Sequence, residues 1–175
     1  MPLVKVMFVC AGNICRSPMA EAVLLNRVQA AGLSAQITVE SSGTGAWHVG
    51  EPAHQGTQAV LRKHGIEFTG AARQFEYADL DAFDYVLAMD RDNLRTIMRA
   101  VNRGDWRAPE QPDRLFDRGG RAEVALFLSY ANRAGTVTET EVPDPYYNGR
   151  YDRVYDLINR GCDALLDHLR QTHHL

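Results

Sequence analysis

A thiol and a guanidinium group lie close together near the start of the chain, in the segment Cys10-Ala11-Gly12-Asn13-Ile14-Cys15-Arg16-Ser17-Pro18. A cysteine thiolate is a strong nucleophile, and the planar guanidinium of an arginine matches two oxygens of a phosphate group. Between Cys10 and Arg16, Gly12 and Asn13 tolerate the left-handed backbone conformations that a tightly curled loop requires. The segment therefore predicts a loop that surrounds a phosphate group and attacks its phosphorus with Cys10.

The elements on either side of this loop must position it. Residues 3–9 form a short apolar run, which is typical of a strand buried in a parallel sheet. Ser17-Pro18 predicts the N-cap and first turn of a helix that Gly32 ends. A helix N-terminus presents unpaired N–H groups and positive partial charge, so it favours both a bound phosphate and the thiolate form of Cys10. Ser17 can cap this helix or donate its hydroxyl to the sulfur.

Strands and helices alternate along the rest of the chain. We expect strands at 36–40, 85–89 and within 124–128, and helices at 55–64, after Asp90 and along 151–169. This order predicts an α/β fold, a doubly wound, mostly parallel four-stranded sheet with helices on both faces. Such sheets bind ligands beyond the carboxyl ends of their strands, where the loop after Val9 lies. The charged stretch 102–122, rich in Gly and Pro, predicts a surface excursion.

Composition narrows the class of protein. A chain of 175 residues, 45% of them hydrophobic, predicts a single domain over 1–175. With 19 Lys and Arg against 22 Asp and Glu, the net charge of −3 gives no reason to expect nucleic acid or an anionic membrane as partner. Three cysteines argue against a disulfide framework and favour the reducing cytoplasm. No stretch has the roughly 18 apolar residues of a membrane helix, so we expect no membrane partner.

The loop matches throughout the pattern Cys-x-Gly-Asn-x-Cys-Arg-Ser-Pro, and in this the chain resembles the low-molecular-weight protein tyrosine phosphatase family. The resemblance continues in the same order along nearly the whole chain, at Ser41, Gly43-Thr44, residues 47–50, Met89-Asp90 and residues 144–147. It implies an enzyme that hydrolyses phosphotyrosine through a cysteinyl-phosphate and needs no cofactor. Its substrates would be tyrosine-phosphorylated proteins or peptides, and inorganic phosphate would be the product.

The resemblance also implies a role for each residue of the site. Cys10 would be the nucleophile, Arg16 the clamp on the transferring phosphoryl group and Asp144 the general acid. The phosphate would be bound by the loop residues Ala11, Gly12, Asn13, Ile14, Cys15, Arg16 and Ser17. The substrate cleft would have Trp47, Tyr146 and Tyr147 as aromatic walls, and Ser41 would hold the loop asparagine in place. Cys15 would form a reversible disulfide with Cys10, although simple packing is the alternative.

The residues themselves leave some roles open. Asp144 precedes Pro145, so its carboxyl group fits a proton donor on a stiffened loop and an ordinary Asx-Pro turn equally well. Asp90 is expected to cap the following helix, and Cys162 to pack in the core. His48, His54 and His64 lack carboxylate or cysteine partners at ligand spacing, so no metal site is expected.

Three alternative functions remain open. An arsenate reductase on the same fold needs two further reactive cysteines downstream, whereas only Cys162 follows the loop. The phosphoarginine phosphatase branch resembles this loop but typically has Thr at the position of Ile14, which favours phosphotyrosine here. A non-catalytic phosphate-binding module would have no need of Cys10, Arg16 and Asp144 together. One departure from many family members is His54-Gln55-Gly56 in place of Asp-Pro-Arg, at the expected rim of the cleft.

Overall fold

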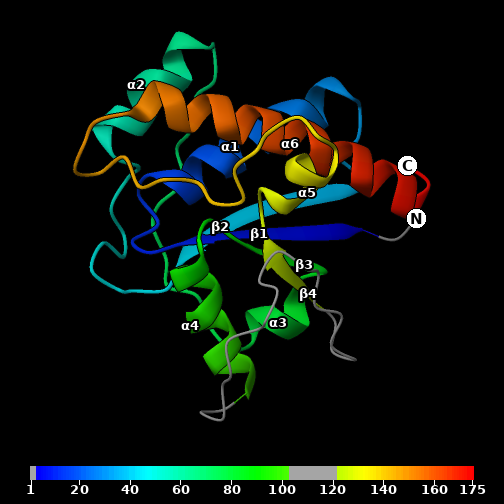
Figure 1. Ribbon diagram of the computed structural model, residues 1–175, viewed down its shortest axis with the longest axis horizontal. Coiled ribbons are helices and arrows are strands. Elements are labelled where there is room, and N and C mark those ends of the chain that lie inside the picture. The colour runs from blue at the N-terminus through cyan, green and yellow to red at the C-terminus, as the bar shows by residue number, and fades with distance from the viewer. Residues whose placement is uncertain (1–2, 103–121) are drawn as a thin grey trace.

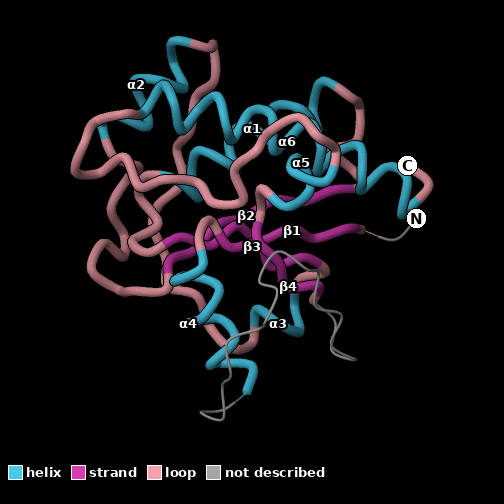
Figure 2. Tube along the Cα trace, viewed as in Figure 1, coloured by secondary structure: helices cyan, strands magenta, loops and turns pink. Residues whose placement is uncertain are grey.

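A parallel four-stranded sheet lies at the centre of the molecule, with the strand order β2-β1-β3-β4 (Figures 1 and 2). The computed structural model describes residues 3–102 and 122–175. Every neighbouring pair of strands is parallel. The strands are β1 (Val4–Cys10), β2 (Ile37–Gly43), β3 (Tyr85–Ala88) and β4 (Glu123–Leu126).

Helices cover both faces of the sheet (Figure 1). One face carries α1 (Arg16–Ala30), α2 (Gln55–Lys63), α5 (Ser129–Arg133) and α6 (Tyr151–His173). The other face carries α3 (Asp79–Ala82) and α4 (Arg91–Asn102). The expected α/β fold with a doubly wound sheet is therefore confirmed, and the sheet is wholly parallel. No helix in the described part of the chain is both long enough and apolar enough to span a membrane.

Side chains of β1 point alternately into two cores, as the pleat of a strand requires. Val6 and Phe8 pack beneath α1 and α6, and the Phe8 ring meets Phe127 edge to face at 5.0 Å. Met7 and Val9 pack with the apolar face of α4 instead. Burial on both faces explains why this stretch of sequence is almost continuously apolar.

The topology places the end of β1 at a switch point. The chain leaves β1 through α1 to reach β2 on one side, and β3 pairs with β1 on the other side. Crossover connections that diverge in this way open a crevice at the carboxyl edge of the sheet. The Cys10 loop lies in that crevice.

Several element boundaries differ from the sequence-based expectations. β1 includes Cys10, because parallel pairing continues to its partner Gly43, and β2 extends past Glu40 for the same reason. The short helices α3 and α5 were not expected from the sequence. The expected helices at 55–64, after Asp90 and near the C-terminus are present, and Cys162 is fully buried. The expected excursion at 102–122 lies almost wholly outside the described residues.

Candidate active site

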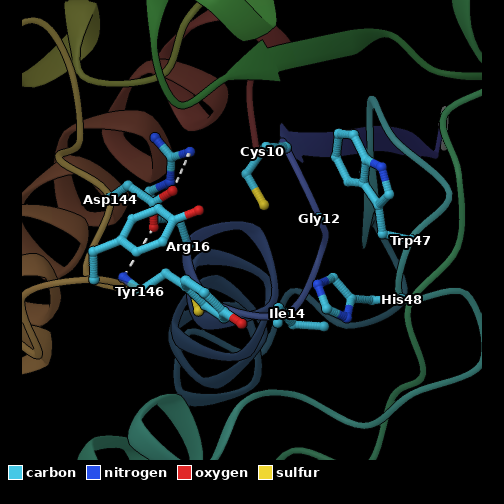
Figure 3. Close-up of a pocket in the computed structure, with 11 residues that line it drawn as sticks. Cys10, Gly12, Ile14, Arg16, Trp47, His48, Asp144 and Tyr146 are labelled. Atoms are coloured by element: carbon cyan, nitrogen blue, oxygen red, sulfur yellow. Dashed lines mark hydrogen bonds and ion pairs between the residues drawn. The ribbon is translucent and has the colours of Figure 1, made fainter.

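A pocket of about 380 Å³ opens at the carboxyl end of β1 (Figure 3). The loop after β1 forms its floor, and the segments around Trp47 and Asp144 form opposite walls. The Cys10 thiol points into the space between these walls (Figure 3). The pocket is lined by Cys10, Ala11, Gly12, Ile14, Cys15, Arg16, Trp47, His48, Asp144, Tyr146 and Tyr147.

Four carbonyl groups of the loop accept hydrogen bonds from residues that do not line this pocket. The carbonyls of Cys10 and Ala11 accept hydrogen bonds from the N–H groups of residues 44 and 45, both at 2.9 Å. The carbonyl of Ile14 accepts from the His54 N–H at 2.7 Å, and that of Cys15 from the Thr57 hydroxyl at 3.1 Å. Because these carbonyls are fixed outward, the loop N–H groups and the first turn of α1 are left to face a bound anion.

Glycine at position 43 permits this close packing of β2 against the loop. A Cβ atom at Gly43 would lie 2.7 Å from the Ala11 carbonyl oxygen and 3.0 Å from the Asn13 nitrogen. Both neighbours are backbone atoms, so they could not move without distorting the loop. The close approach of the loop backbone therefore requires glycine at position 43.

Two donors surround the Cys10 sulfur. The Ser17 hydroxyl lies 3.0 Å from Sγ, and the Asn13 backbone N–H donates to it at 3.3 Å. Both groups are placed where they can hydrogen-bond a thiolate, which is the nucleophilic form of a cysteine. The expectation that Ser17 caps the helix is wrong, because α1 begins at Arg16 with Cys15 as N-cap. The Ser17 hydroxyl contacts the Cys10 sulfur instead.

Arg16 is buried and held rigidly. Its Nη1 donates to Asp90 Oδ2 at 2.6 Å and to the Val142 carbonyl at 3.0 Å, and its Nη2 lies 3.6 Å from Asp144 Oδ2. Burial lowers the pKa of Arg16, but the negative charges of Cys10, Asp90 and Asp144 outweigh it and raise that pKa. The guanidinium therefore stays charged although its side chain is almost wholly buried, and in such surroundings its attraction for an anion is strong.

Asp90 has a second function that the sequence analysis missed. One carboxylate oxygen caps α4 as expected, by accepting from the Asn93 N–H at 2.8 Å, while the other holds Arg16. Asp90 follows β3, which is the neighbour of β1 in the sheet. Residues that follow adjacent parallel strands meet at one edge, and this rule could have indicated the pairing.

Asp144 forms the Asx turn that its sequence allowed, and its carboxyl group also lines the pocket. Its Oδ1 accepts from the Tyr146 N–H at 3.0 Å, which is an Asx turn. Its Oδ2 is directed toward Arg16, and the side chain lines the pocket with 42% of its surface exposed (Figure 3). The turn fixes the carboxyl group opposite Cys10 and leaves one oxygen for chemistry.

The walls of the pocket are aromatic, and their outer parts are exposed. Trp47 is 72% exposed and Tyr147 90%, and the ring of Tyr146 packs edge to face against that of Tyr147 at 5.0 Å. His48 was not expected here, yet its ring lies against Gly12 and pairs with Glu51 at 2.8 Å. These surfaces suit a flat aryl group above the phosphate loop.

Asn13 supports the loop from behind the pocket. Its φ of 57° is the left-handed conformation expected of it. Its amide nitrogen donates to Ser17 Oγ at 2.8 Å and to Ser41 Oγ at 2.9 Å, while its amide oxygen accepts from the Arg73 N–H at 3.0 Å. Asn13 and Ser17 are buried and stand behind the pocket, whereas the other loop residues line it.

Cys15 is joined to a second network that the sequence did not reveal. Its Sγ lies 3.5 Å from the Tyr151 hydroxyl, which in turn lies 2.8 Å from Nδ1 of His54. Burial, chiefly, raises the pKa of Cys15 to about 11. Cys15 is therefore protonated at neutral pH, although it lines the same pocket as Cys10.

Within residues 3–102 and 122–175, no group of three or more His, Cys, Asp or Glu side chains could hold a metal ion. The cysteines described, Cys10, Cys15 and Cys162, are all unpaired.

Comparisons with known proteins find similar sequences and similar structures. A sequence model described as low molecular weight phosphotyrosine protein phosphatase matches residues 5–175. The low molecular weight protein-tyrosine-phosphatase YfkJ of Bacillus subtilis is 38% identical over 174 residues, which cover 99% of this chain and 100% of YfkJ. Its crystal structure gives a TM-score of 0.83 over 98% of each chain.

Two further relatives extend the comparison. The low molecular weight protein-tyrosine-phosphatase PtpA of Staphylococcus aureus is 40% identical over 167 residues, 95% of this chain and 94% of PtpA. The crystal structure of a Drosophila arginine phosphatase is 30% identical, with a TM-score of 0.77 over 95% of this chain and 98% of that one.

Proposed function

Because the chain belongs to the family of low molecular weight phosphotyrosine protein phosphatases, we propose that Cys10, Arg16 and Asp144 perform its catalysis. The observation that carries this proposal is the convergence of the three side chains on one pocket. The sulfur is surrounded by donors at the floor, the guanidinium is fixed beside it, and the carboxyl group stands across the opening.

The reaction proceeds in two steps. Cys10 Sγ attacks phosphorus and forms the cysteinyl-phosphate, while Asp144 gives its proton to the departing tyrosyl oxygen. Water then attacks the cysteinyl-phosphate, Asp144 takes the proton, and inorganic phosphate leaves. The loop N–H groups and Arg16 stabilise the charge on the equatorial oxygens in both transition states. Both hydrogens of Arg16 Nη1 are already bonded, so we assign Nε and Nη2 to the phosphate.

We assign phosphotyrosine on proteins or peptides as the substrate. Trp47, Tyr146 and Tyr147 offer surfaces on which the ring can stack, and Ile14 adds an apolar contact beside the loop. Arsenate reduction would need two further reactive cysteines on a flexible segment, whereas Cys162 is fully buried in α6. The three unpaired cysteines and the thiolate chemistry suit the reducing cytoplasm. Nothing in the site favours nucleic acid.

The purified protein should hydrolyse p-nitrophenyl phosphate, and vanadate should inhibit the reaction in competition with the substrate. Among peptides, a phosphotyrosine peptide should give a kcat/KM at least tenfold above that of a phosphoarginine peptide, on the order of what one pocket contact contributes. Phosphate release measured for both peptides at one pH checks the assignment. A preference for phosphoarginine would assign the protein to the phosphoarginine phosphatase branch. Absence of turnover on p-nitrophenyl phosphate and on both peptides would indicate a non-catalytic phosphate-binding module.

Mild peroxide should inactivate the enzyme reversibly. Oxidation of Cys10 gives a sulfenic acid, and the Cys15 thiol displaces water from it to form a disulfide that added thiols reduce. Because the pKa of Cys15 is raised to about 11, the disulfide should form about tenfold faster for each pH unit between 7 and 10. Peptide mapping after oxidation at several pH values measures this rate. Recovery from peroxide that is unchanged in Cys15→Ser would show that Cys15 only packs.

A further inference from the structure

A carboxylate that the reaction does not use lies behind the phosphate loop. Glu21 is on α1, outside the pocket, and its Oε2 accepts a hydrogen bond from the Ser41 hydroxyl at 2.5 Å. Ser41 in turn contacts Asn13, and Asn13 contacts Ser17 beside the Cys10 sulfur. The carboxylate thus stands at the far end of a chain of hydrogen bonds that leads to the nucleophile.

The direction of every bond in this chain can be deduced. The Arg73 N–H can only donate, so the atom of Asn13 that faces it is the oxygen, and the other amide atom is the NH₂ group. Its two hydrogens go to Ser17 Oγ and Ser41 Oγ. Each hydroxyl oxygen therefore accepts from Asn13 and has its own hydrogen left to donate. Ser41 gives its hydrogen to Glu21.

The same reasoning applies to Ser17. With its oxygen accepting from Asn13, its hydrogen goes to the Cys10 sulfur at 3.0 Å or to the Ser42 carbonyl at 3.3 Å. A charged acceptor makes the stronger bond, so the thiolate of Cys10 takes it. A chain of this kind strengthens along its length because each bond polarises the next.

We propose that the carboxylate of Glu21 is a positioning residue for the catalytic loop: through Ser41 and Asn13 it fixes the loop and aims the Ser17 hydroxyl at the Cys10 sulfur. This inference rests on the proposed role of Cys10 as nucleophile. A neutral group at position 21 would still accept from Ser41, but more weakly, and the loop asparagine would be held less firmly.

The surroundings of Glu21 make its charge conditional on pH. Burial raises the pKa of Glu21 to about 7; the Ser41 hydroxyl lowers it, Glu40 on β2 raises it, and Arg73 lowers it. Arg73 is shared with Asp79 and Glu40, so its charge is only partly available to Glu21. The positioning carboxylate is present above about pH 7 and is lost as the pH falls through that value.

The pH affects the stability of the fold in the opposite direction: the charged form of Glu21, which positions the loop, makes the fold less stable. The folded protein holds the proton of Glu21 more tightly than the unfolded chain, whose value is the ordinary 4.5. Stability therefore falls as the pH rises from 4.5 to about 7, and the loss is complete above that range. A residue kept only to stabilise the fold would not behave in this way.

The test compares Glu21→Gln with the unmodified enzyme across pH. The ratio of their kcat/KM values cancels the ionisation of the substrate. It should be near one at pH 5 and should fall about tenfold by pH 8, the usual difference between a charged and a neutral acceptor. At pH 8 the thermal unfolding midpoint of the variant should be roughly 5 °C higher. A variant that is equally slow at both pH values, or less stable at pH 8, would overturn the proposal.

Two controls distinguish an effect transmitted through these hydrogen bonds from a general effect of charge. Glu40→Gln removes the neighbouring carboxylate without touching Ser41, so its enzyme should keep a full pH response with a slightly lower midpoint. In a Ser41→Ala background, Glu21→Gln should have no further effect on kcat/KM, because the chain is already broken. Full additivity of the two substitutions would contradict the assigned route.

Two measurements keep this inference distinct from the proposed function. Carboxyl-carbon NMR of the unmodified protein, which needs no turnover, should show Glu21 ionising near pH 7, and an ordinary midpoint near 4.5 overturns the inference. If Cys10→Ser keeps its turnover, the proposed function fails, and the inference fails with it. If turnover depends on Cys10 but the Glu21→Gln ratio is flat with pH, the inference fails alone.

Discussion

Replacement of Cys10 by serine should abolish turnover and leave phosphate binding close to normal. A serine hydroxyl has nearly the size of a thiol, but it is not ionised at neutral pH and is a poor nucleophile. The proposed anion cradle consists of loop N–H groups and Arg16, and the contacts of Arg16 with Asp90 and Val142 do not involve the sulfur. The residual rate should be lower by at least about 10⁴-fold, as when a nucleophile that acts as part of a unit is removed.

Steady-state hydrolysis of p-nitrophenyl phosphate and calorimetric titration with phosphate measure the two halves of this result. Cys15→Ser is the matched control, because it removes the other thiol that lines the pocket and should keep most of the activity. If the turnover of Cys10→Ser falls by much less than about 10⁴-fold, or if Cys15→Ser is the inactive variant, the nucleophile must be reassigned. Loss of phosphate binding in Cys10→Ser would show that the sulfur helps to shape the cradle.

The geometry of the Cys10 loop could be predicted because the residues that form it are neighbours in the sequence. A strand, a Gly-Asn turn and a helix start within a short stretch specify a phosphate-binding loop through local backbone preferences alone. The apolar runs and helical stripes likewise predicted the sheet and the long helices. Ser17 shows the limit of this local reasoning. Ser-Pro is typical of an N-cap and the first helical residue, but the helix begins at Arg16 and its N-cap residue is Cys15.

The supporting contacts could not be predicted in the same way, because they join residues far apart in the chain. Asp90 reaches Arg16 across 74 positions, and Ser41 reaches Glu21 and Asn13 from the neighbouring strand. The hydrophobic periodicity of the sequence does not reveal such pairs, and they can be inferred only once the strand order is known. Helices α3 and α5 were missed for a different reason: each is too short for a helical period to be recognised.

Asp144→Ala should slow formation of the cysteinyl-phosphate much more for phosphotyrosine than for p-nitrophenyl phosphate. A general acid matters in proportion to how poorly the oxygen leaves without a proton. The tyrosyl oxygen has a pKa near 10, roughly that of free tyrosine, and p-nitrophenol is far more acidic. The loss for phosphotyrosine should be on the order of 10²–10⁴-fold, and the loss for p-nitrophenyl phosphate should be small.

The comparison must be made on the first step alone, because Asp144 is also proposed to activate water in the second step, which both substrates share. Pre-steady-state bursts of phenol release isolate that first step. Asp90→Asn provides the matched control. It removes the ion pair that holds Arg16, and because Arg16 is proposed to bind the phosphoryl group whatever the leaving group is, this variant should slow both substrates equally. If Asp144→Ala also slows both equally, its carboxyl group shapes the Asx turn that carries Tyr146 and does not donate the proton.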